Sequence, residues 1–338
     1  MNQSSHTIDA APSASPSAVV QRLRRRYVAT DDDPELRRHL GRILIARDDG
    51  ALTLDPIRHG DEGDTRGVMV MAPPGAGKTR LVGTALDDLL KASGATVGEG
   101  RHPILRVTVP APATLKSLGL ELLAATGYGA MGVRQERWHI WSTVRHRLGV
   151  VGARVLWLDE AQHLMGRATE VTQALDTLKT LMQGPNAVAV ILSGVPALAR
   201  VFTIDEQVGR RFSHMTLTEG RSPKVARGVG MMIARFAEEA GLGAPTERDL
   251  AARLLHGVDG RFGLCMETVV DAIAQALSVK AGTLERQHFA EAWGLGRGCA
   301  PGDNVFLVDA WAGTPPLGVP PAPVEEETAT KRRGRGRR

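Results

Sequence analysis

The hydrophobic positions of this chain follow a helical period near both ends and a strand pattern between them. Residues 21–46 place Leu23, Leu36 and Leu40 at helical spacing, which predicts two short amphipathic helices broken at residues 31–34. Five short apolar runs then predict buried strands, at residues 67–72, 104–109, 154–158, 187–192 and 214–218. Helical patterns lie between them, at residues 80–93, 113–126, 134–148 and 169–182. Because strands that are apolar on both faces are typical of covered parallel sheets, we predict an α/β fold with a five-stranded parallel sheet sandwiched by helices.

Beyond residue 218 the strand pattern stops and only helical patterns remain. They fall at residues 223–241, 246–256, 262–279 and 284–293, and predict a small all-helical second domain. The expected segments are a disordered leader at 1–18, a helical lead-in at 19–65, an α/β core at 66–218, a helical lid at 219–299, and a Pro/Gly-rich linker with a basic tail at 300–338. The leader is rich in Ser, Ala and Pro, which bury too little apolar surface to offset the entropy of ordering.

Charge and cysteine content narrow the class of protein. The formal net charge is +5, but residues 331–338 hold six of the 42 basic groups, which leaves 36 basic against 37 acidic groups in residues 1–330. The basic tail is therefore expected to act separately from a nearly neutral body. Two cysteines, Cys265 and Cys299, and no CxxC pair argue against a secreted disulfide framework. No apolar run approaches the roughly 18 residues of a membrane span, so we expect a cytoplasmic protein without a membrane partner.

A phosphate-binding loop is the strongest motif. Residues 72–79 read APPGAGKT, and they stand between a predicted strand and a predicted helix. Gly75 and Gly77 allow backbone N–H groups to turn toward a phosphate, Lys78 reaches its oxygens, and the Thr79 hydroxyl can ligate Mg²⁺. Ala72 replaces the usual first glycine, which costs little if that residue keeps strand geometry. The predicted nucleotide-binding residues of this segment are Pro74, Gly75, Ala76, Gly77, Lys78, Thr79 and Arg80.

An acidic pair ends the third predicted strand. Residues 155–164 read VLWLDEAQHL, so Asp159 and Glu160 fall at the carboxyl edge of the sheet, where open α/β sheets bind ligands. Asp159 is expected to hold Mg²⁺ together with Thr79. Glu160 is the candidate catalytic residue, because a carboxylate beside the γ-phosphate can orient the attacking water. The expected ligands are therefore ATP and Mg²⁺.

The extra strand at 104–109 and the glutamate after Asp159 resemble the additional-strand catalytic-glutamate class of P-loop ATPases, and the order of motifs resembles AAA+ proteins. In that resemblance Ser193 occupies the position of a sensor residue that contacts the γ-phosphate or the water; the alternative is a serine that caps the following turn. Arg211 aligns best with the arginine finger that completes a neighbour's site, with Arg210 as the second candidate and surface ion pairs as the alternative. Arg261 resembles the second sensor, a phosphate-contacting arginine of the lid; a solvated arginine is the alternative.

Further segments resemble the TniB and TnsC family of transposition ATPases, relatives of MuB and IstB. These segments are residues 158–164, residues 107–117, residues 192–196 and the pair Arg211–Phe212. The resemblance implies a DNA-binding ATPase that forms a ring or helical filament of identical subunits on double-stranded DNA, largely without regard to sequence. It also implies that the protein recruits and activates a DDE transposase, works with a target-selection protein, and uses ATP hydrolysis to control assembly and disassembly.

The same resemblance points to a DNA contact after the second predicted strand, at Thr114, Lys116 and Ser117. The alternative is that Thr114 caps a helix and Lys116 is a solvated residue of its first turn. The next helix offers a second candidate DNA contact, with Arg134, Arg137, Arg145 and Arg147, although their helical spacing equally describes a solvated face. Acidic motifs of this type also occur in ExeA-like secretion ATPases and Orc-like replication initiators or loaders, which remain alternative functions. A metabolic kinase with the same phosphate loop is a different class of protein. It would need a lid over the substrate that accepts the phosphate, in place of the arginine finger and the sensor-bearing helical domain.

Overall fold

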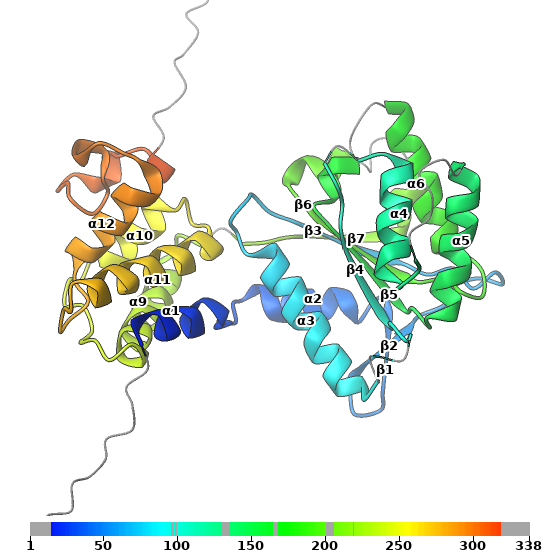
Figure 1. The fold of residues 1–338 in the computed structure, drawn as a ribbon, viewed down its shortest axis with the longest axis horizontal. Coiled ribbons are helices and arrows are strands. Elements are labelled where there is room, and N and C mark those ends of the chain that lie inside the picture. The colour runs from blue at the N-terminus through cyan, green and yellow to red at the C-terminus, as the bar shows by residue number, and fades with distance from the viewer. Residues whose placement is uncertain are drawn as a thin grey trace, which may run out of the picture. The chain divides into compact units, whose positions relative to one another are not determined.

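The computed structural model describes residues 15–318 except 96–97, 99, 112, 130–135, 165–167, 201–205 and 219. Its described residues divide into two compact units, each treated separately below (Figure 1). The sheet unit comprises residues 21–220 and 260–266, and the helical unit comprises residues 15–20, 221–259 and those from 267 onward. Within these described ranges, every helix is too short or too polar to span a bilayer.

The sheet unit contains a five-stranded parallel sheet, as the apolar runs predict. The strand order is β4–β5–β6–β3–β7, so the strand that leads into the phosphate loop, β3, lies at an inner position between β6 and β7. The strands are β3 (Gly67–Met71), β4 (Ile104–Thr108), β5 (Val155–Asp159), β6 (Ala189–Gly194) and β7 (Phe212–Thr216). Since β6 separates β3 from β5, the acidic pair and the phosphate loop approach each other across one intervening strand.

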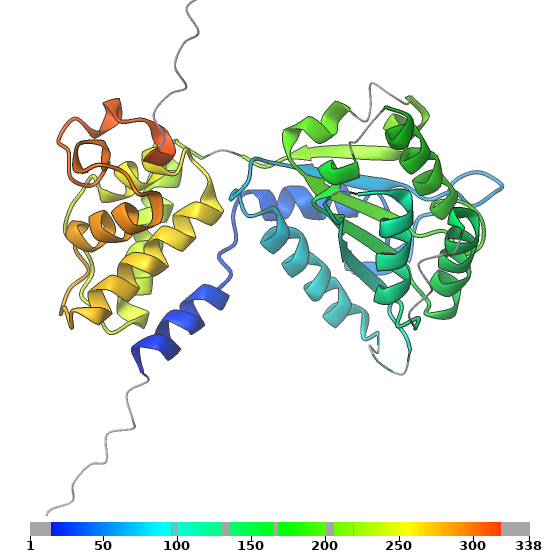
Figure 2. The same cartoon turned by 45° about the horizontal axis from the view of Figure 1, so that its top comes forward.

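Helices cover both faces of this sheet (Figures 1 and 2). Among the described residues of the sheet unit, the α-helices between β3 and β7 are α3 (Lys78–Ser93), α4 (Leu115–Ala125), α5 (Arg137–Val150), α6 (Ala168–Leu181) and α8 (Glu206–Arg211). One core lies between the sheet and α4, α5 and α6, and contains Leu156 and Leu158 of β5. The other core lies under α3 and contains Val155 and Trp157 of the same strand. Alternate residues of β5 thus point to opposite faces, which explains why the whole strand is apolar.

The N-terminal segment differs in part from the expected helical lead-in. Helices α1 (Pro16–Arg25) and α2 (Asp32–Leu40) are present, and α1 begins at Pro16, within the predicted leader of residues 1–18. An antiparallel hairpin of β1 (Leu44–Ala46) and β2 (Leu52–Pro56) follows, where the prediction had only helix and loop. In β2 buried residues alternate with more exposed ones, and Gly50 has a φ of 78° in the connecting turn. A strand as short as β2 provides too few residues for this alternation to be recognised in sequence.

The helical unit contains the four predicted helices: α9 (Pro223–Glu239), α10 (Leu250–Gly257), α11 (Phe262–Ser278), whose first turn belongs to the sheet unit, and α12 (Arg286–Arg297). The prediction of a linker from residue 300 onward is wrong for the first part of this segment, which packs into the helical unit. Val305 and Phe306 are buried, and Asn304 donates a hydrogen bond to the carbonyl oxygen of Ala290. The nearly buried Arg253 donates to two further carbonyl oxygens of this segment. Residues 305–308 read VFLV, an apolar run too short to establish a period, so sequence patterning could not identify this segment.

Candidate functional site

The phosphate loop connects β3 to α3, and its backbone has the conformation that its glycines predict. Gly75 and Gly77 have φ values of 77° and 104°, which residues with a Cβ rarely adopt. Ala72 is fully buried and its N–H donates to Gly194 at the end of β6, so this position continues the strand pairing and needs no glycine. The replacement of the first glycine therefore leaves the loop intact.

Lys78 begins α3, and its ammonium group lies against the loop. Its Nζ donates to the carbonyl oxygens of Ala72 and Pro73 at 2.9 and 3.2 Å, and the residue is 6% exposed. Burial lowers the pKa of the Lys78 ammonium, and the carboxylates of Glu160 and Asp159 oppose that shift. The carboxylates at the end of β5 and the lysine on α3 thus interact electrostatically across the site.

Asp159 and Thr79 meet at the carboxyl edge of the sheet. The Thr79 hydroxyl donates to Oδ2 of Asp159 at 2.7 Å, and the Glu160 backbone N–H donates to Oδ1 at 3.0 Å. Glu160 has a φ of 56°, an unusual conformation for a residue with a side chain and one that is often found at functional sites. Gln162 donates its side-chain amide to the Glu160 carboxylate and also accepts from the N–H of Val195. The structure therefore places both predicted acidic residues beside the loop.

Ser193 does not have the environment expected of a phosphate sensor. It is completely buried, its Oγ lies 2.5 Å from Oδ1 of Asp159, and it accepts a hydrogen bond from the Trp157 indole at 2.8 Å. Its hydrogen bonds are therefore made within the protein. The alternative of a turn-capping serine does not describe these contacts either, because they join two strands.

The beginning of α11 contacts the phosphate loop within the sheet unit. Arg261 donates to the Pro74 carbonyl at 3.3 Å, and the Leu264 N–H donates to the Gly75 carbonyl at 2.9 Å. A Cβ on Gly263 would lie 2.5 Å from that same carbonyl oxygen, so this close approach requires a glycine. Arg261 is therefore beside the loop, as the resemblance implies.

The guanidinium group of Arg80, in contrast, contacts the N-terminal segment of the chain. It donates to the carbonyl oxygens of Arg24 and Arg26 at 3.3 and 2.9 Å. These contacts tie the first turn of α3 to the N-terminal segment. Only the backbone of Arg80 remains for the binding role that the motif predicts.

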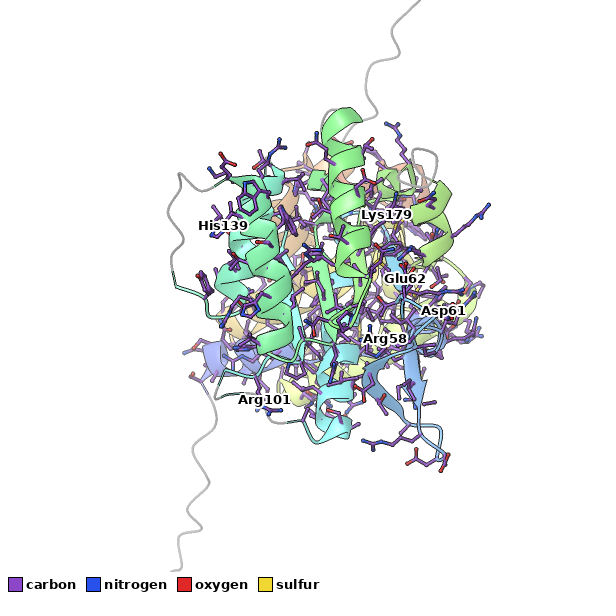
Figure 3. All side chains as sticks on the ribbon, turned by 90° about the vertical axis from the view of Figure 1, so that its right-hand side faces the viewer. Arg58, Asp61, Glu62, Arg101, His139 and Lys179 are labelled. Carbon is purple, nitrogen blue, oxygen red and sulfur yellow. The ribbon has the colours of Figure 1, made fainter. Side chains whose placement is uncertain are left out.

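The two candidate finger residues at the end of α8 have different environments. Arg211 donates to Asp64 at 2.6 Å, and the side chains are only 21% and 27% exposed. Asp64 is itself fixed by paired backbone hydrogen bonds with His59. Arg58 anchors the same loop by donating to Gly63 and Gly184, on the side of the unit that Figure 3 presents. Arg210 is exposed. Exposure thus favours Arg210 over Arg211 for contact with a second subunit.

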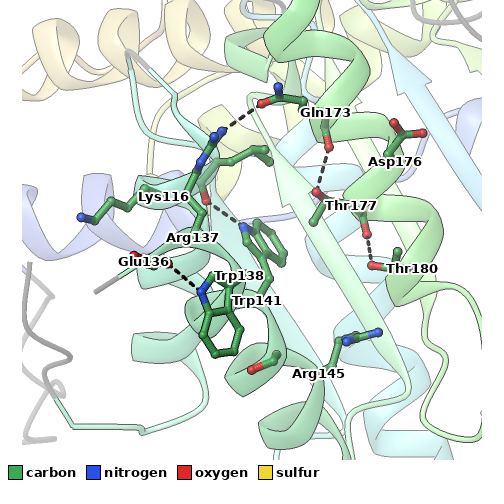
Figure 4. Close-up of a pocket in the computed structure, with 12 residues that line it drawn as sticks. Lys116, Glu136, Arg137, Trp138, Trp141, Arg145, Gln173, Asp176, Thr177 and Thr180 are labelled. Carbon is green, nitrogen blue, oxygen red and sulfur yellow. Dashed lines mark hydrogen bonds between the residues drawn. The ribbon is translucent and has the colours of Figure 1, made fainter. Parts of the chain in front are cut away.

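The predicted DNA-binding residues lie at the start of α4. Thr114 and Ser117 form a reciprocal capping box, in which Thr114 Oγ1 accepts from the Ser117 N–H and Ser117 Oγ accepts from the Thr114 N–H. The capping alternative is therefore correct for Thr114. Lys116 lies at the rim of a groove of about 940 Å³ between α4, α5 and α6, which Arg137, Trp138 and Arg145 also line (Figure 4).

The other basic residues near α5 divide between this groove and structural contacts. Arg137 donates to Gln173 of α6 at 2.9 Å. Arg147 donates to the Thr126 carbonyl and lies 5.4 Å from the Tyr128 ring centroid, so it fixes the end of α4. Arg134 lies outside the described residues.

Sequence reasoning missed three residues of the site: Trp157, Asp64 and Gly263. Trp157 occupies an apolar strand position, where an aromatic residue gives no sign of a polar contact. The partners of Asp64 and Gly263 are distant in sequence, so no local spacing could identify them.

Solved structures share this fold. ORC2 of Aeropyrum pernix, solved in ADPNP and ADP complexes, has a TM-score of 0.54 at 15% identity, over 84% of this chain and 75% of that chain. CDC6p of Pyrobaculum aerophilum has a TM-score of 0.57 at 11% identity, over 84% and 75%. ORC1 of Aeropyrum pernix, solved in complex with DNA, has a TM-score of 0.54 at 15% identity, over 82% and 67%. The fold is therefore the AAA+ P-loop fold, with a parallel sheet, flanking helices and a helical C-terminal region.

The model of the bacterial TniB protein family matches residues 54–221. Over these residues the chain is similar to the TniB family. The matched range contains the phosphate loop, the acidic pair, Ser193 and both arginines of α8. No curated protein matches the sequence.

The Arg211–Asp64 ion pair is expected to stabilise the fold. Arg211→Ala and Asp64→Ala should each lower the free energy of unfolding by about 1–3 kcal/mol, because each leaves a half-buried charge without its partner. The double variant should lose clearly less than the sum of the two single losses. Urea unfolding of the four proteins measures this, with Arg210→Ala as the exposed control; additive losses would contradict a coupled pair.

Proposed function

We propose that this chain is an ATPase that requires Mg²⁺. The hydroxyl of Thr79 at 2.7 Å from the carboxylate of Asp159, beside the phosphate loop, is the observation that carries the proposal. Hydroxyl and carboxylate oxygens are the hard donors that Mg²⁺ prefers, and the left-handed glycines leave backbone N–H groups for phosphate. When bound, the metal ion would neutralise charge on the phosphates. Lys78 and Arg261 are the side chains that would supply further positive charge.

Glu160 is the proposed catalytic carboxylate. Gln162 orients it, and its own left-handed backbone conformation projects it from the end of β5. A carboxylate fixed in this way can accept a proton from a water molecule that attacks the terminal phosphate. Ser193 is not assigned this contact, because its hydrogen bonds are made to Asp159 and Trp157.

Lys78→Ala should abolish ATP binding, whereas Glu160→Gln should bind ATP like the wild type and lose turnover. The first change removes a contact made in the ground state, and the second removes only the base. Binding of a fluorescent ATP analogue and release of phosphate measure the two steps separately. An equal loss of ATP affinity in both variants would contradict the role of Glu160.

We propose further that Arg210 completes the site of a neighbouring subunit in a homo-oligomeric ring or filament. An arginine that acts on a neighbour must be exposed, and Arg210 is exposed whereas the Arg211 side chain is only 21% exposed. Its charge would stabilise the transition state, so its loss is expected to affect hydrolysis far more than nucleotide binding.

Arg210→Ala should bind ATP and lose most of its hydrolysis. Mixing it in equal amounts with Glu160→Gln, which keeps Arg210 but cannot turn over, should restore activity to about a quarter of the wild-type rate. Half of the sites in the mixture keep Glu160, and random assembly places a neighbour that keeps Arg210 beside half of those sites. Phosphate release in the presence of DNA measures this. Arg211→Ala provides the matched comparison: if that variant alone is rescued by mixing, the finger is Arg211.

The cellular process we propose is transposition. The protein would assemble on double-stranded DNA with little sequence preference, respond to a target-selection protein, and recruit and activate a DDE transposase, with ATP hydrolysis controlling disassembly. The TniB match supports this assignment over a secretion ATPase or a replication initiator. The fold shared with the DNA-bound ORC1 structure is compatible with a DNA-binding role but does not select the process.

DNA binding should depend on ATP and weaken steeply with salt, because contacts to phosphates release counterions. Lys116→Ala should reduce the slope of log K against log salt concentration by about one unit if Lys116 contacts one phosphate. Thr114→Ala should leave the slope unchanged and destabilise α4 by about 1 kcal/mol, because it removes a helix cap. Lys91→Ala, on α3, is the charge-matched control for these titrations. An unchanged slope in Lys116→Ala would exclude Lys116 as a phosphate contact.

A further inference from the structure

Trp157 lies two residues before the proposed metal-binding aspartate, on the same face of β5. Side chains two residues apart in a strand point to the same side, so Trp157 and Asp159 both face α3. The pairing of Leu158 with Leu192 places Ser193 of β6 next to Asp159. The strand register thus brings an indole, a hydroxyl and a carboxylate together, and each of them is at least nine-tenths buried.

The direction of the hydrogen bonds in this group follows from its chemistry. An indole N–H can only donate, so the Ser193 oxygen at 2.8 Å must accept from it. A serine hydroxyl has one hydrogen, and the Asp159 Oδ1 atom at 2.5 Å is its acceptor. Oδ1 is therefore held by Ser193 and the Glu160 N–H, whereas Oδ2 faces the Thr79 hydroxyl.

The indole is itself held in place. The Arg106 guanidinium of β4 lies 5.9 Å from the ring centroid and is fixed by an ion pair with Asp87 of α3 at 2.6 Å. On the α3 side, Trp157 is 5% exposed and packs in the core that this helix covers. The contact with Arg106 and the packing of this core therefore restrict movement of the Trp157 side chain.

We propose that Trp157 and Ser193 are positioning residues for Asp159. The indole fixes the Ser193 hydroxyl, and that hydroxyl holds Oδ1 so that Oδ2 stays beside Thr79. The inference rests on the proposed Mg²⁺–ATP function, and it replaces a phosphate-sensing role for Ser193 with a role in metal affinity. Groups that orient a metal ligand typically contribute about 10- to 100-fold to metal affinity.

The test is the Mg²⁺ dependence of nucleotide binding by the full-length chain, followed with a fluorescent, non-hydrolysable ATP analogue. Trp157→Phe keeps an aromatic ring and removes the N–H, and Ser193→Ala removes the hydroxyl. Each should raise the Mg²⁺ concentration needed for half-maximal enhancement of binding by about tenfold, with affinity in EDTA unchanged. Trp141→Phe is the matched control, because it removes an indole N–H that donates to the Leu115 carbonyl in the α4–α5 region instead.

The double variant Trp157→Phe/Ser193→Ala distinguishes positioning from general damage. Because Trp157 acts only through Ser193, the double variant should match Ser193→Ala alone. An unchanged Mg²⁺ requirement in Trp157→Phe, fully additive effects, or an equal loss of affinity in EDTA would overturn the inference. A wild-type protein that binds the analogue without any response to Mg²⁺ would instead contradict the proposed ATPase function itself.

Discussion

The burial of one carboxylate, that of Asp159, constrains much of the sheet unit. The residue is 8% exposed, and a charge removed from water to that extent is costly unless hydrogen-bond donors surround it. The donors come from the first turn of α3, from the end of β6 and from the backbone after β5. These elements are far apart in the sequence. The carboxylate therefore receives all three hydrogen bonds only when the strands are in register and the first turn of α3 lies beside the end of β5.

The phosphate loop depends on the same arrangement. The N–H of Ala72 pairs with Gly194 just beyond Ser193, so the loop leaves the sheet at a position set by β6. On its other side the loop contacts the first turn of α11, where Gly263 permits an approach that a Cβ would prevent. Strand register and one glycine contact thus place the proposed nucleotide-binding groups, and neither depends on an unusual loop sequence.

Much of the fold could be predicted from sequence because its signals are local. Continuous apolar runs identified all five strands of the parallel sheet, and the APPGAGKT segment identified the turn between β3 and α3. The hairpin β1–β2 and the segment around Phe306 were missed because each has too few residues to establish a period. The contacts of Ser193 and Arg211 were missed for another reason, since their partners lie 34 and 147 residues away. A resemblance can align such residues with a motif, but only the tertiary structure shows which hydrogen bonds they make.

Nucleotide binding by Asp159→Asn tests the central role of this carboxylate most directly. The substitution keeps the shape of the side chain and removes its charge, so calorimetric titration with a non-hydrolysable ATP analogue can compare it with the wild type in Mg²⁺ and in EDTA. We expect equal affinities in EDTA and an increase on addition of Mg²⁺ only in the wild type. An Asp159→Asn protein that responds to Mg²⁺ as the wild type does would contradict the account.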